Sequence, residues 1–498
     1  MLQLPAGREA SGDGGSVGYE RHRPERTLLY QLVEEFYPAF RVQWAAEGRV
    51  LPDYVQREFE DYLKCGRLES GFLRVRCGTC HAERLVAFSC KRRGICSSCG
   101  ARRMAESGAL LVDAVFPCQP VRQWVLSFPY PLRFLFASRP KTMGQVLGIV
   151  YRVIAPHLIH KAGLTRATAH TGAVTLIQCF GSSLNLNVHF HMLFLDGVYV
   201  EGRPGTLKRF QWVKAPSSDE LTRLTHTIAR RVGRFLEHQG LLESDAENCY
   251  LTGDAADDDS MAHLHGHSIT YRIAVGPHQG RKGFTLQTLP ACDPDDPDTV
   301  GKTAGFSLHA GVAAKARERD KLERLCRYIT RPAVSEKRLS LTAHGKVRYE
   351  LKTPYRDGTT HVIFEPLDFI ARLAALVPKP RVNLTRYHGV FAPNSAHRSQ
   401  VTPAGRGRGN PPKDPGKEQQ TTPGERHAAM SWAQRLKRVF NIDIQTCSAC
   451  GGAVKVIACI EDPVVIDKIL THLDEKVASA GTGLLPQVRA PPQAGLFD

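Results

Sequence analysis

The sequence predicts an α+β protein with mainly antiparallel sheets, and two observations carry this prediction. Between residues 116 and 392, runs of β-branched and aromatic residues alternate with amphipathic helical stretches. Several strand-like runs are followed by turn signals such as Gly276-Pro277 and Asp357-Gly358, which are typical of hairpins rather than of the helical crossovers in a parallel sheet. We therefore expect antiparallel sheets with helices packed against them.

Apolar periodicity locates the individual elements. The expected helices lie at 221–238 and 310–330, and the expected strands lie at 174–179, 184–195, 269–275, 284–289, 347–351 and 362–364. The runs 269–275 and 284–289 are predicted to form a hairpin. Its basic, glycine-rich connection would either contact phosphate or form a plain solvated turn.

Length and composition predict several units. A chain of 498 residues is longer than one hydrophobic core usually supports. Residues 1–26 and 393–426 are rich in glycine, proline and charge, so we expect a disordered tail and a disordered linker. Three folded units remain: a cysteine-rich unit at 27–115, a main domain at 116–392 and a small C-terminal unit at 427–498.

The charge balance predicts a nucleic-acid partner. The chain has 66 Lys and Arg residues against 49 Asp and Glu residues, a net charge of +17, and such an excess attracts a polyanion. We expect no membrane association, because we find no uninterrupted apolar span of about 18 residues and no basic amphipathic anchor. The N-terminal residues also lack the apolar core of a signal peptide. We therefore expect a cytoplasmic protein with reduced thiols.

Four of the 14 cysteines have the C-x2-C-x15-C-x2-C spacing of a zinc site: Cys77, Cys80, Cys96 and Cys99. Two such C-x2-C turns complete a closed tetrahedron, which predicts structural Zn²⁺. Cys65, Cys90 and His81 lie nearby and could replace one ligand or bind a second ion. Eight arginines and lysines between residues 74 and 103 would present cations to phosphates. A zinc-containing, DNA-binding domain is therefore expected at 27–115.

A second cysteine pair lies near the C-terminus. Cys447 and Cys450 form half a zinc knuckle, and Cys459 is the only further cysteine close in sequence. Because zinc normally takes four ligands, the pair is either completed by a histidine or is an unoccupied remnant.

The strand predicted at 184–195 carries a pair of histidines. Side chains alternate across a strand, so its apolar residues form one face, and Asn185, Asn187, His189 and His191 form the other. Two imidazoles at i and i+2 can bind one divalent ion and leave positions open for a phosphate ester. His189 and His191 are therefore candidate metal ligands. Gln178, His267 and His361 are candidates for a third ligand.

A helix with one tyrosine follows. Leu322, Leu325, Cys326 and Ile329 recur at helical spacing and predict a buried stripe, with Tyr328 beside it. A phenol needs nearby positive charge or a metal to attack phosphorus at neutral pH. Three cations share the face of Tyr328 and are candidate DNA-binding residues: Lys321, Arg324 and Arg331. Tyr328 is therefore a candidate catalytic nucleophile.

Four segments carry a family resemblance: FSCKRRGICSSCGARRMAE, FGSSLNLNVHFHMLFLDGVY, GHSITYRIAVGPHQGRK and LERLCRYITRP. Over about residues 30–395 the chain resembles transposases of the insertion sequence 91 family and their common-region relatives. The resemblance implies the rolling-circle HUH endonuclease class, with His189-Phe190-His191 as the metal motif, Mg²⁺ or Mn²⁺ as the ion, and an antiparallel HUH-type core at 116–392.

The resemblance also implies the reaction. Tyr328 would attack single-stranded DNA, form a 5′-phosphotyrosine and leave a free 3′-OH. Some family members have two tyrosines four positions apart, but Arg324 and Pro332 occupy those positions here, so the chain resembles the single-tyrosine branch. A second subunit in a homodimer, the free 3′-OH, or Tyr349 or Tyr355 could resolve the second strand transfer.

Two other functions are considered as alternatives. A plasmid or phage replication initiator or relaxase would use the same chemistry. A zinc-dependent DNA-binding regulator would bind DNA without cutting it.

Overall fold

The computed structural model describes residues 17–18, 23–203, 205–244, 249–252, 261–288, 300–405, 442–443 and 445–480. The chain divides into two compact units. The small unit contains Met1–Arg23, Gly66–Phe88 and Ala428–Pro492, and the main unit contains Pro24–Cys65, Ser89–His427 and Gln493–Asp498. The expected cysteine-rich domain at 27–115 is therefore split between the two units, because its middle part, Gly66–Phe88, groups with the C-terminal segment Ala428–Pro492.

A six-stranded antiparallel sheet forms the centre of the main unit. In spatial order its strands are β13 (Val300–Thr303), β14 (Phe306–Ala314), β4 (Val121–Ser127), β7 (Leu186–Leu195), β6 (Gly172–Phe180) and β18 (Thr385–Gly389). The strands predicted at 174–179 and 184–195 are thus adjacent and central. The sheet and its helices confirm the α+β class.

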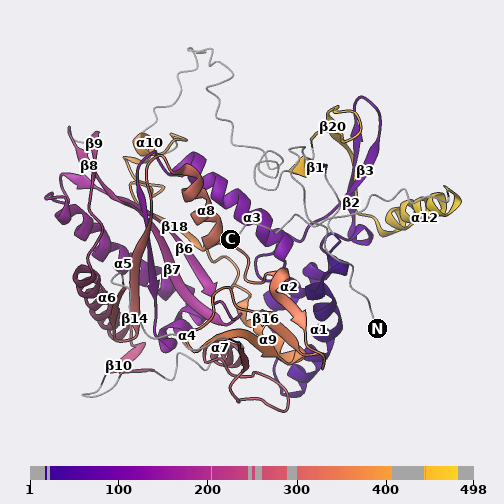
Figure 1. The fold of residues 1–498 in the computed structure, drawn as a ribbon, viewed down its shortest axis with the longest axis horizontal. Helices are drawn as coiled ribbons and strands as arrows, with labels where there is room; N and C mark the ends of the chain where they lie inside the picture. Colours follow the sequence, from indigo (N-terminus) through magenta and orange to yellow (C-terminus); the bar gives the residue numbers. More distant parts are fainter. Residues whose placement is uncertain are drawn as a thin grey trace. The chain divides into compact units, whose positions relative to one another are not determined.

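Helices cover both faces of this sheet (Figure 1). Even-numbered residues of β7, such as Phe190 and Met192, pack in one core with α4 (Tyr130–Ser138), α5 (Pro140–Lys161) and α6 (Ser218–His238). Leu193 and Leu195 face the other way, into a core with η3 (Leu111–Val115) and α8 (Arg319–Thr330). The alternation predicted from the sequence therefore places His189 and His191 on the α8 side.

A third hydrophobic core combines helices from the N-terminal and C-terminal parts of the main unit's sequence. Its helices are α1 (Leu28–Ala46), α2 (Asp53–Lys64), α7 (Ala262–Ile269) and α9 (Pro366–Leu376), and it includes a four-stranded sheet. The order of that sheet is β12 (Phe284–Gln287), β17 (Thr359–Phe364), β16 (Val347–Glu350) and β15 (Leu339–Leu341). A separate three-stranded sheet has the order β5 (Ala169–His170), β8 (Gly197–Glu201) and β9 (Leu207–Trp212). Helix α3 (Ser97–Leu110) packs against α8.

The small unit is built on a sheet that joins distant segments. Strand β20 (Val454–Ile460) pairs with β2 (Phe72–Cys77), which pairs with β3 (Glu83–Ala87). Helix α12 (Pro463–Ala480) follows β20 directly.

Two predicted elements are wrong. Residues 269–275 are not a strand: α7 ends at Ile269, and the expected hairpin is reduced to one bridge between Arg272 and Lys282. Strand β12 pairs instead with β17. The helix expected at 310–330 begins only at Arg319, because the residues before it complete β14 between β13 and β4. Sheet pairing overrides the helix propensity of this alanine-rich run.

The expected tail and linker fall largely outside the described residues. Within the linker region, residues 393–405 are described and include α10 (Arg398–Val401), in which Val401 is buried. The expected linker therefore begins too early. Helix α5 is long and apolar enough to span a membrane, although no such span was expected, but most of it is buried inside the protein. It serves as a core helix of the main unit.

Candidate active site and metal centres

His189 and His191 project from the same face of β7 and are largely buried. Burial, with smaller contributions from the positive charges of Arg331 and Arg133, lowers the pKa of His189 to about 4. Burial also lowers the pKa of His191, together with the charges of His189 and Arg331. Both imidazoles are therefore neutral at pH 7, which is the form that binds a metal ion.

The two rings point their Nε2 atoms at each other, 3.0 Å apart. Nδ1 of His189 lies 2.8 Å from the main-chain carbonyl of Asn187, so Nδ1 carries the proton and Nε2 has a free lone pair. The side-chain amide nitrogen of Gln123 lies 2.7 Å from Nδ1 of His191; when this amide is rotated so that its oxygen accepts from Nδ1, Nε2 of His191 also has a free lone pair. Ligands bound at about 2.1 Å and at right angles stand about 3 Å apart. The Nε2 separation therefore fits two adjacent ligands of one octahedral ion.

Tyr328 lies in the last turn of α8. Leu322, Cys326 and Ile329 are buried against the sheet as predicted, whereas Leu325 is only half-buried. The side chain of Tyr328 is also half-buried, so its ring rests on this core and remains partly accessible to solvent.

Two cations flank the ring of Tyr328. The Arg331 guanidinium carbon lies 4.2 Å from the ring centroid, and the Lys352 ammonium lies 4.5 Å from it. Nη1 of Arg331 also donates to the carbonyl of Tyr328 at 2.9 Å. Lys352 was not predicted, because it lies just after β16 and only the tertiary fold brings it to α8. Cations at this range are attracted electrostatically to the face of the ring.

The C-terminal end of α8 lies beside the histidine pair. Gln178 of β6 is directly opposite His189 in register, and its amide donates to the carbonyl of Ile329 at 3.0 Å. Arg331 is close enough to lower the pKa of both histidines while it covers the Tyr328 ring. The predicted nucleophile and the predicted metal pair are thus on the same face of one sheet.

Gln178 is also the best placed of the three candidates for a third ligand. His267 lies on α7, where its Nδ1 bonds the carbonyl of His263 at 2.9 Å. His361 lies on β17 of the other sheet, with its Nδ1 2.8 Å from the hydroxyl of Thr360. Within the described chain, no group of three His, Cys, Asp or Glu residues includes the His189–His191 pair. Of the three candidates, Gln178 is therefore the one whose strand position is directly opposite His189.

Tyr349 cannot serve as a second nucleophile. Its side chain is 2% exposed, and its hydroxyl lies 3.2 Å from the amide nitrogen of Ser335 and 3.5 Å from the carbonyl of Ala333. Burial raises its pKa. A phenol held in this way is shielded from a DNA backbone.

Eight cysteines of the described residues form two clusters rather than the single predicted one. The main-unit cluster contains Cys65, Cys90, Cys96 and Cys99. Its Sγ–Sγ distances are 3.6 Å for Cys90–Cys99 and 3.7 Å for both Cys65–Cys96 and Cys65–Cys99. These distances are too long for disulfides. They match the edge of about 3.8 Å in a tetrahedron with zinc–sulfur bonds of about 2.3 Å.

The small-unit cluster contains Cys77, Cys80, Cys447 and Cys450. Its Sγ atoms are 3.5 Å apart for Cys77–Cys450 and 3.6 Å apart for Cys80–Cys447. Backbone N–H groups of Cys80 and Thr79 lower the pKa of Cys77 to about 6, which favours the thiolate that binds zinc. The C-terminal half-knuckle is therefore completed by Cys77 and Cys80. Cys459 instead contacts Glu461.

The predicted grouping of Cys77 and Cys80 with Cys96 and Cys99 is corrected accordingly. Each C-x2-C turn supplies two thiolates, but the fold assigns the two turns to different partners. Cys65 and Cys90, considered as substitute ligands, complete the site of Cys96 and Cys99. His81 is exposed and belongs to neither cluster.

Two models of known protein families match the chain. A family model described as "Putative transposase" matches residues 172–399, which contain the histidine pair and Tyr328. A model of the insertion sequence 91 type, described as "Transposase zinc-binding domain", matches residues 32–128. Together the two models cover more than half of the chain. The chain belongs to the insertion sequence 91 family of transposases. Searches of curated proteins and of solved structures found no match.

The transposase is thus a DNA-processing enzyme with a zinc-binding domain. Its zinc-binding match includes all four cysteines of the main-unit cluster but ends before Cys447 and Cys450 of the small-unit cluster. The small-unit cluster therefore depends on a segment outside both family models.

Helix α3 connects the main-unit cluster to the tyrosine helix of the transposase. The Sγ of Cys96 caps the start of α3 by accepting from the amide of Cys99. Farther along, a Cβ on Gly100 would lie 2.7 Å from Cβ of Pro332, and one on Gly108 would lie 2.7 Å from Cγ of Arg327. Two glycines thus allow α3 to lie close to α8 and to the proline that ends it.

The other predicted DNA-binding residues of the transposase are on the outer side of α8. Lys321 and Arg324 are exposed, and Lys321 forms an ion pair with Glu318 at 3.3 Å. Such an exposed pair contributes little to stability, so the lysine can exchange this partner for a phosphate.

Proposed function

We propose that this transposase cuts and rejoins single-stranded DNA through a 5′-phosphotyrosine at Tyr328, as in rolling-circle transposition. One observation carries the proposal: Arg331 covers the Tyr328 ring and lowers the pKa of both metal-pair histidines, so all these groups share one face of the central sheet. A half-exposed phenol, a cation and a neutral histidine pair are the components that phosphodiester transfer requires.

The cleavage step exchanges one phosphate ester for another. The Tyr328 oxygen attacks the phosphorus, its phenolic proton passes to solvent, and a bond from this oxygen to phosphorus forms. The bond from phosphorus to the 3′ oxygen breaks, and that oxygen takes up a proton to become a free 3′-OH. Rejoining reverses the step, because a 3′-OH attacks the phosphotyrosine and releases the tyrosine. No oxidant or nucleotide cofactor is needed.

The surrounding residues would bind and orient the DNA. His189 and His191, with Gln178 as third donor, would hold one Mg²⁺ or Mn²⁺ ion, which would withdraw charge from a scissile phosphate oxygen. Arg331 and Lys352 would hold the Tyr328 ring in place, and Arg331 would also contact the phosphate.

Two further groups complete the proposal. Lys321 and Arg324 would bind the DNA backbone along the outer side of α8. Each four-cysteine cluster would hold one structural Zn²⁺, because all four positions of the tetrahedron are taken by thiolates. A second copy of the chain in a homodimer is one way to supply a tyrosine for the second strand transfer.

The decisive experiment is adduct formation. The full chain is incubated with labelled single-stranded oligonucleotides from the DNA flanking its gene, with Mg²⁺ or Mn²⁺, and separated under denaturing conditions. We expect a covalent protein–DNA band that Tyr328→Phe reduces by more than about 1,000-fold, and that the matched control Tyr355→Phe retains. An adduct that survives Tyr328→Phe would overturn the assignment of the nucleophile. DNA binding without any adduct would favour the regulator.

The same protein and flanking DNA can distinguish a transposase from a replication initiator. A donor plasmid bearing the flanking DNA should yield joined products at new target sites when the wild-type protein is present. Adducts without any strand transfer to a target would favour an initiator or relaxase.

A further inference from the structure

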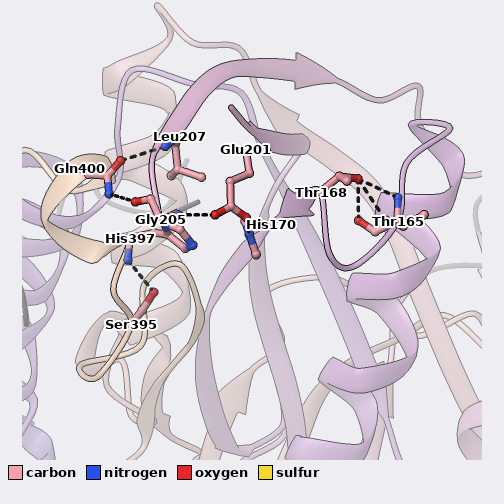
Figure 2. Close-up of polar contacts among 9 residues, drawn as sticks. All are labelled: Thr165, Thr168, His170, Glu201, Gly205, Leu207, Ser395, His397 and Gln400. Carbon is pink, nitrogen blue, oxygen red and sulfur yellow. Dashed lines mark hydrogen bonds and ion pairs between the residues drawn. The ribbon is translucent and has the colours of Figure 1, made fainter. Parts of the chain in front are cut away.

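A group of three potential metal ligands lies away from the cysteine clusters and the histidine pair. His170 belongs to β5, Glu201 ends β8, and His397 directly precedes α10 (Figure 2). One ligand atom from each residue lies within 4.8 Å of the other two. All three residues belong to the main unit and are half-buried.

The side chains converge in a way that a simple ion pair does not explain. Nε2 of His170 lies 2.8 Å from Oε2 of Glu201, so these two residues pair directly. The ring of His397 lies against that of His170, with centroids 4.4 Å apart at an angle of 35°. Nδ1 of His397 is shielded from solvent and has no hydrogen-bond partner in the described part of the protein. In the tautomer that leaves this shielded nitrogen unprotonated, it can bind a metal together with the carboxylate and the second imidazole.

The supporting backbone is held in place by other contacts. His170 is paired in register with Tyr199 of β8. The side chain of Gln400 accepts from the amide of Leu207 at 3.0 Å and donates to the carbonyl of Gly205 at 2.8 Å (Figure 2). These two bonds hold the segment that carries His397 beside the turn after Glu201. The three ligands therefore come from segments far apart in sequence that are already positioned together.

We propose that His170, Glu201 and His397 bind a divalent transition-metal ion, with zinc preferred. Two imidazole nitrogens and one carboxylate oxygen form a ligand set that zinc takes with a fourth position open. One carboxylate supplies negative charge that partly offsets the charge of the ion. Hard ions such as Mg²⁺ and Ca²⁺ prefer oxygen ligands, so this nitrogen-rich set selects against them.

A groove borders His170 and His397. A cavity of about 510 Å³ is lined by His170 and His397 and also by Arg152 and Arg166, both of which are exposed. The fourth ligand would be a water or an anionic oxygen admitted from this groove. The bound ion would tie β5, β8 and the segment before α10 together, which stabilises the end of the main unit.

The test measures bound metal in the full chain. Co²⁺ and Zn²⁺ are titrated into metal-free wild-type protein and into His397→Ala, Glu201→Gln and His160→Ala. His160 is exposed at the end of α5 and lies outside the cluster, so His160→Ala is the matched control. We expect wild type and control to bind one equivalent more than the two cluster variants. The extra Co²⁺ should lack the thiolate-to-metal charge-transfer band of cysteine sites.

Thermal unfolding gives a second readout. Zn²⁺ should raise the Tm of wild type and His160→Ala by several degrees more than that of the cluster variants, while the metal-free proteins should unfold alike. Should His397→Ala fail to fold, Glu201→Gln decides, because it keeps the volume of the side chain and removes only its charge. Equal metal content and equal Co²⁺ spectra in wild type and Glu201→Gln would overturn the proposal. The outcome is independent of adduct formation at Tyr328.

Discussion

The two cysteine clusters have the same four thiolates but different positions in the fold. The main-unit cluster draws all its ligands from residues 65–99, and three of its four cysteines are buried. The small-unit cluster joins Cys77 and Cys80 to Cys447 and Cys450, and two of its cysteines are exposed. The main-unit cluster links cysteines that are close together in the sequence, whereas the small-unit cluster links cysteines that are far apart in the sequence.

This difference predicts different roles. The main-unit cluster begins α3, and α3 packs against the helix that carries Tyr328. Its metal should therefore support the geometry of the active site. The small-unit cluster holds together β2 and β20, whose pairing depends on segments far apart in sequence. Its metal should stabilise the small unit without setting the position of the tyrosine.

The largest effect is expected from Cys99→Ser in the main-unit cluster. Loss of one thiolate should release the metal, lower the free energy of unfolding of the main unit by about 4 kcal/mol or more, and reduce the Tyr328 adduct to background. Zinc content, thermal unfolding and the adduct assay measure these three results. Cys118→Ser, at an exposed cysteine outside both clusters, is the control and should leave all three unchanged.

A smaller effect is expected from Gly100→Ala. The added Cβ would lie 2.7 Å from Cβ of Pro332 and would displace the end of α8. A shift of about 1 Å at a reacting group can cost about 100-fold in rate, so we expect adduct formation to fall about 10- to 100-fold. Zinc content should stay the same. Ser107→Ala on the same helix is the control, and equal rates in the two variants would show that α3 does not position the tyrosine.

Lys352→Ala should slow adduct formation less than Gly100→Ala does. This effect involves neither cysteine cluster. The ammonium lies 4.5 Å from the Tyr328 ring centroid and is exposed. Exposed cation–π contacts contribute about 0.5–1 kcal/mol, so the adduct rate should fall about 2- to 5-fold. Lys352→Arg should restore most of the rate. A loss as large as that of Gly100→Ala would mean that Lys352 contacts the reacting phosphate directly.

Cys450→Ser should have the smallest effect on cleavage. The small-unit cluster should lose its metal, and the Gly66–Phe88 segment should become sensitive to proteolysis. Adduct formation on a short single-stranded oligonucleotide should stay within about 2-fold of wild type, because residues that share no contacts act independently and the small unit contributes no residue to the candidate active site. A loss of adduct formation as large as the loss expected for Cys99→Ser would contradict the different roles proposed for the two clusters.

Local periodicity was sufficient to predict where several residues of the candidate site lie on their strand and helix. The alternation along 184–195 placed His189 and His191 opposite the apolar residues of the same strand, and the structure has this arrangement. The helical spacing before Pro332 placed Tyr328 beside a buried stripe, although Leu325 is less buried than expected. Both patterns depend only on neighbouring residues, whose geometry follows from the strand or helix itself.

Contacts between distant segments could not be predicted in this way. Lys352 reaches Tyr328, and Gln178 reaches Ile329, only because separate elements pack together. Residues 269–275 do not form the expected strand for a related reason. Strand β12 pairs with β17, which is far away in the sequence, instead of with this neighbouring segment.

By itself the sequence determined the class of fold, the face of each histidine and the presence of thiolate pairs that bind zinc. Only the tertiary structure decided which thiolate pairs share an ion and which cations surround the tyrosine. The physical reason is that a C-x2-C turn specifies the spacing of two ligands but not their partners. Partner choice depends on which strands and helices pack together over the whole chain, and that is a property of the assembled cores.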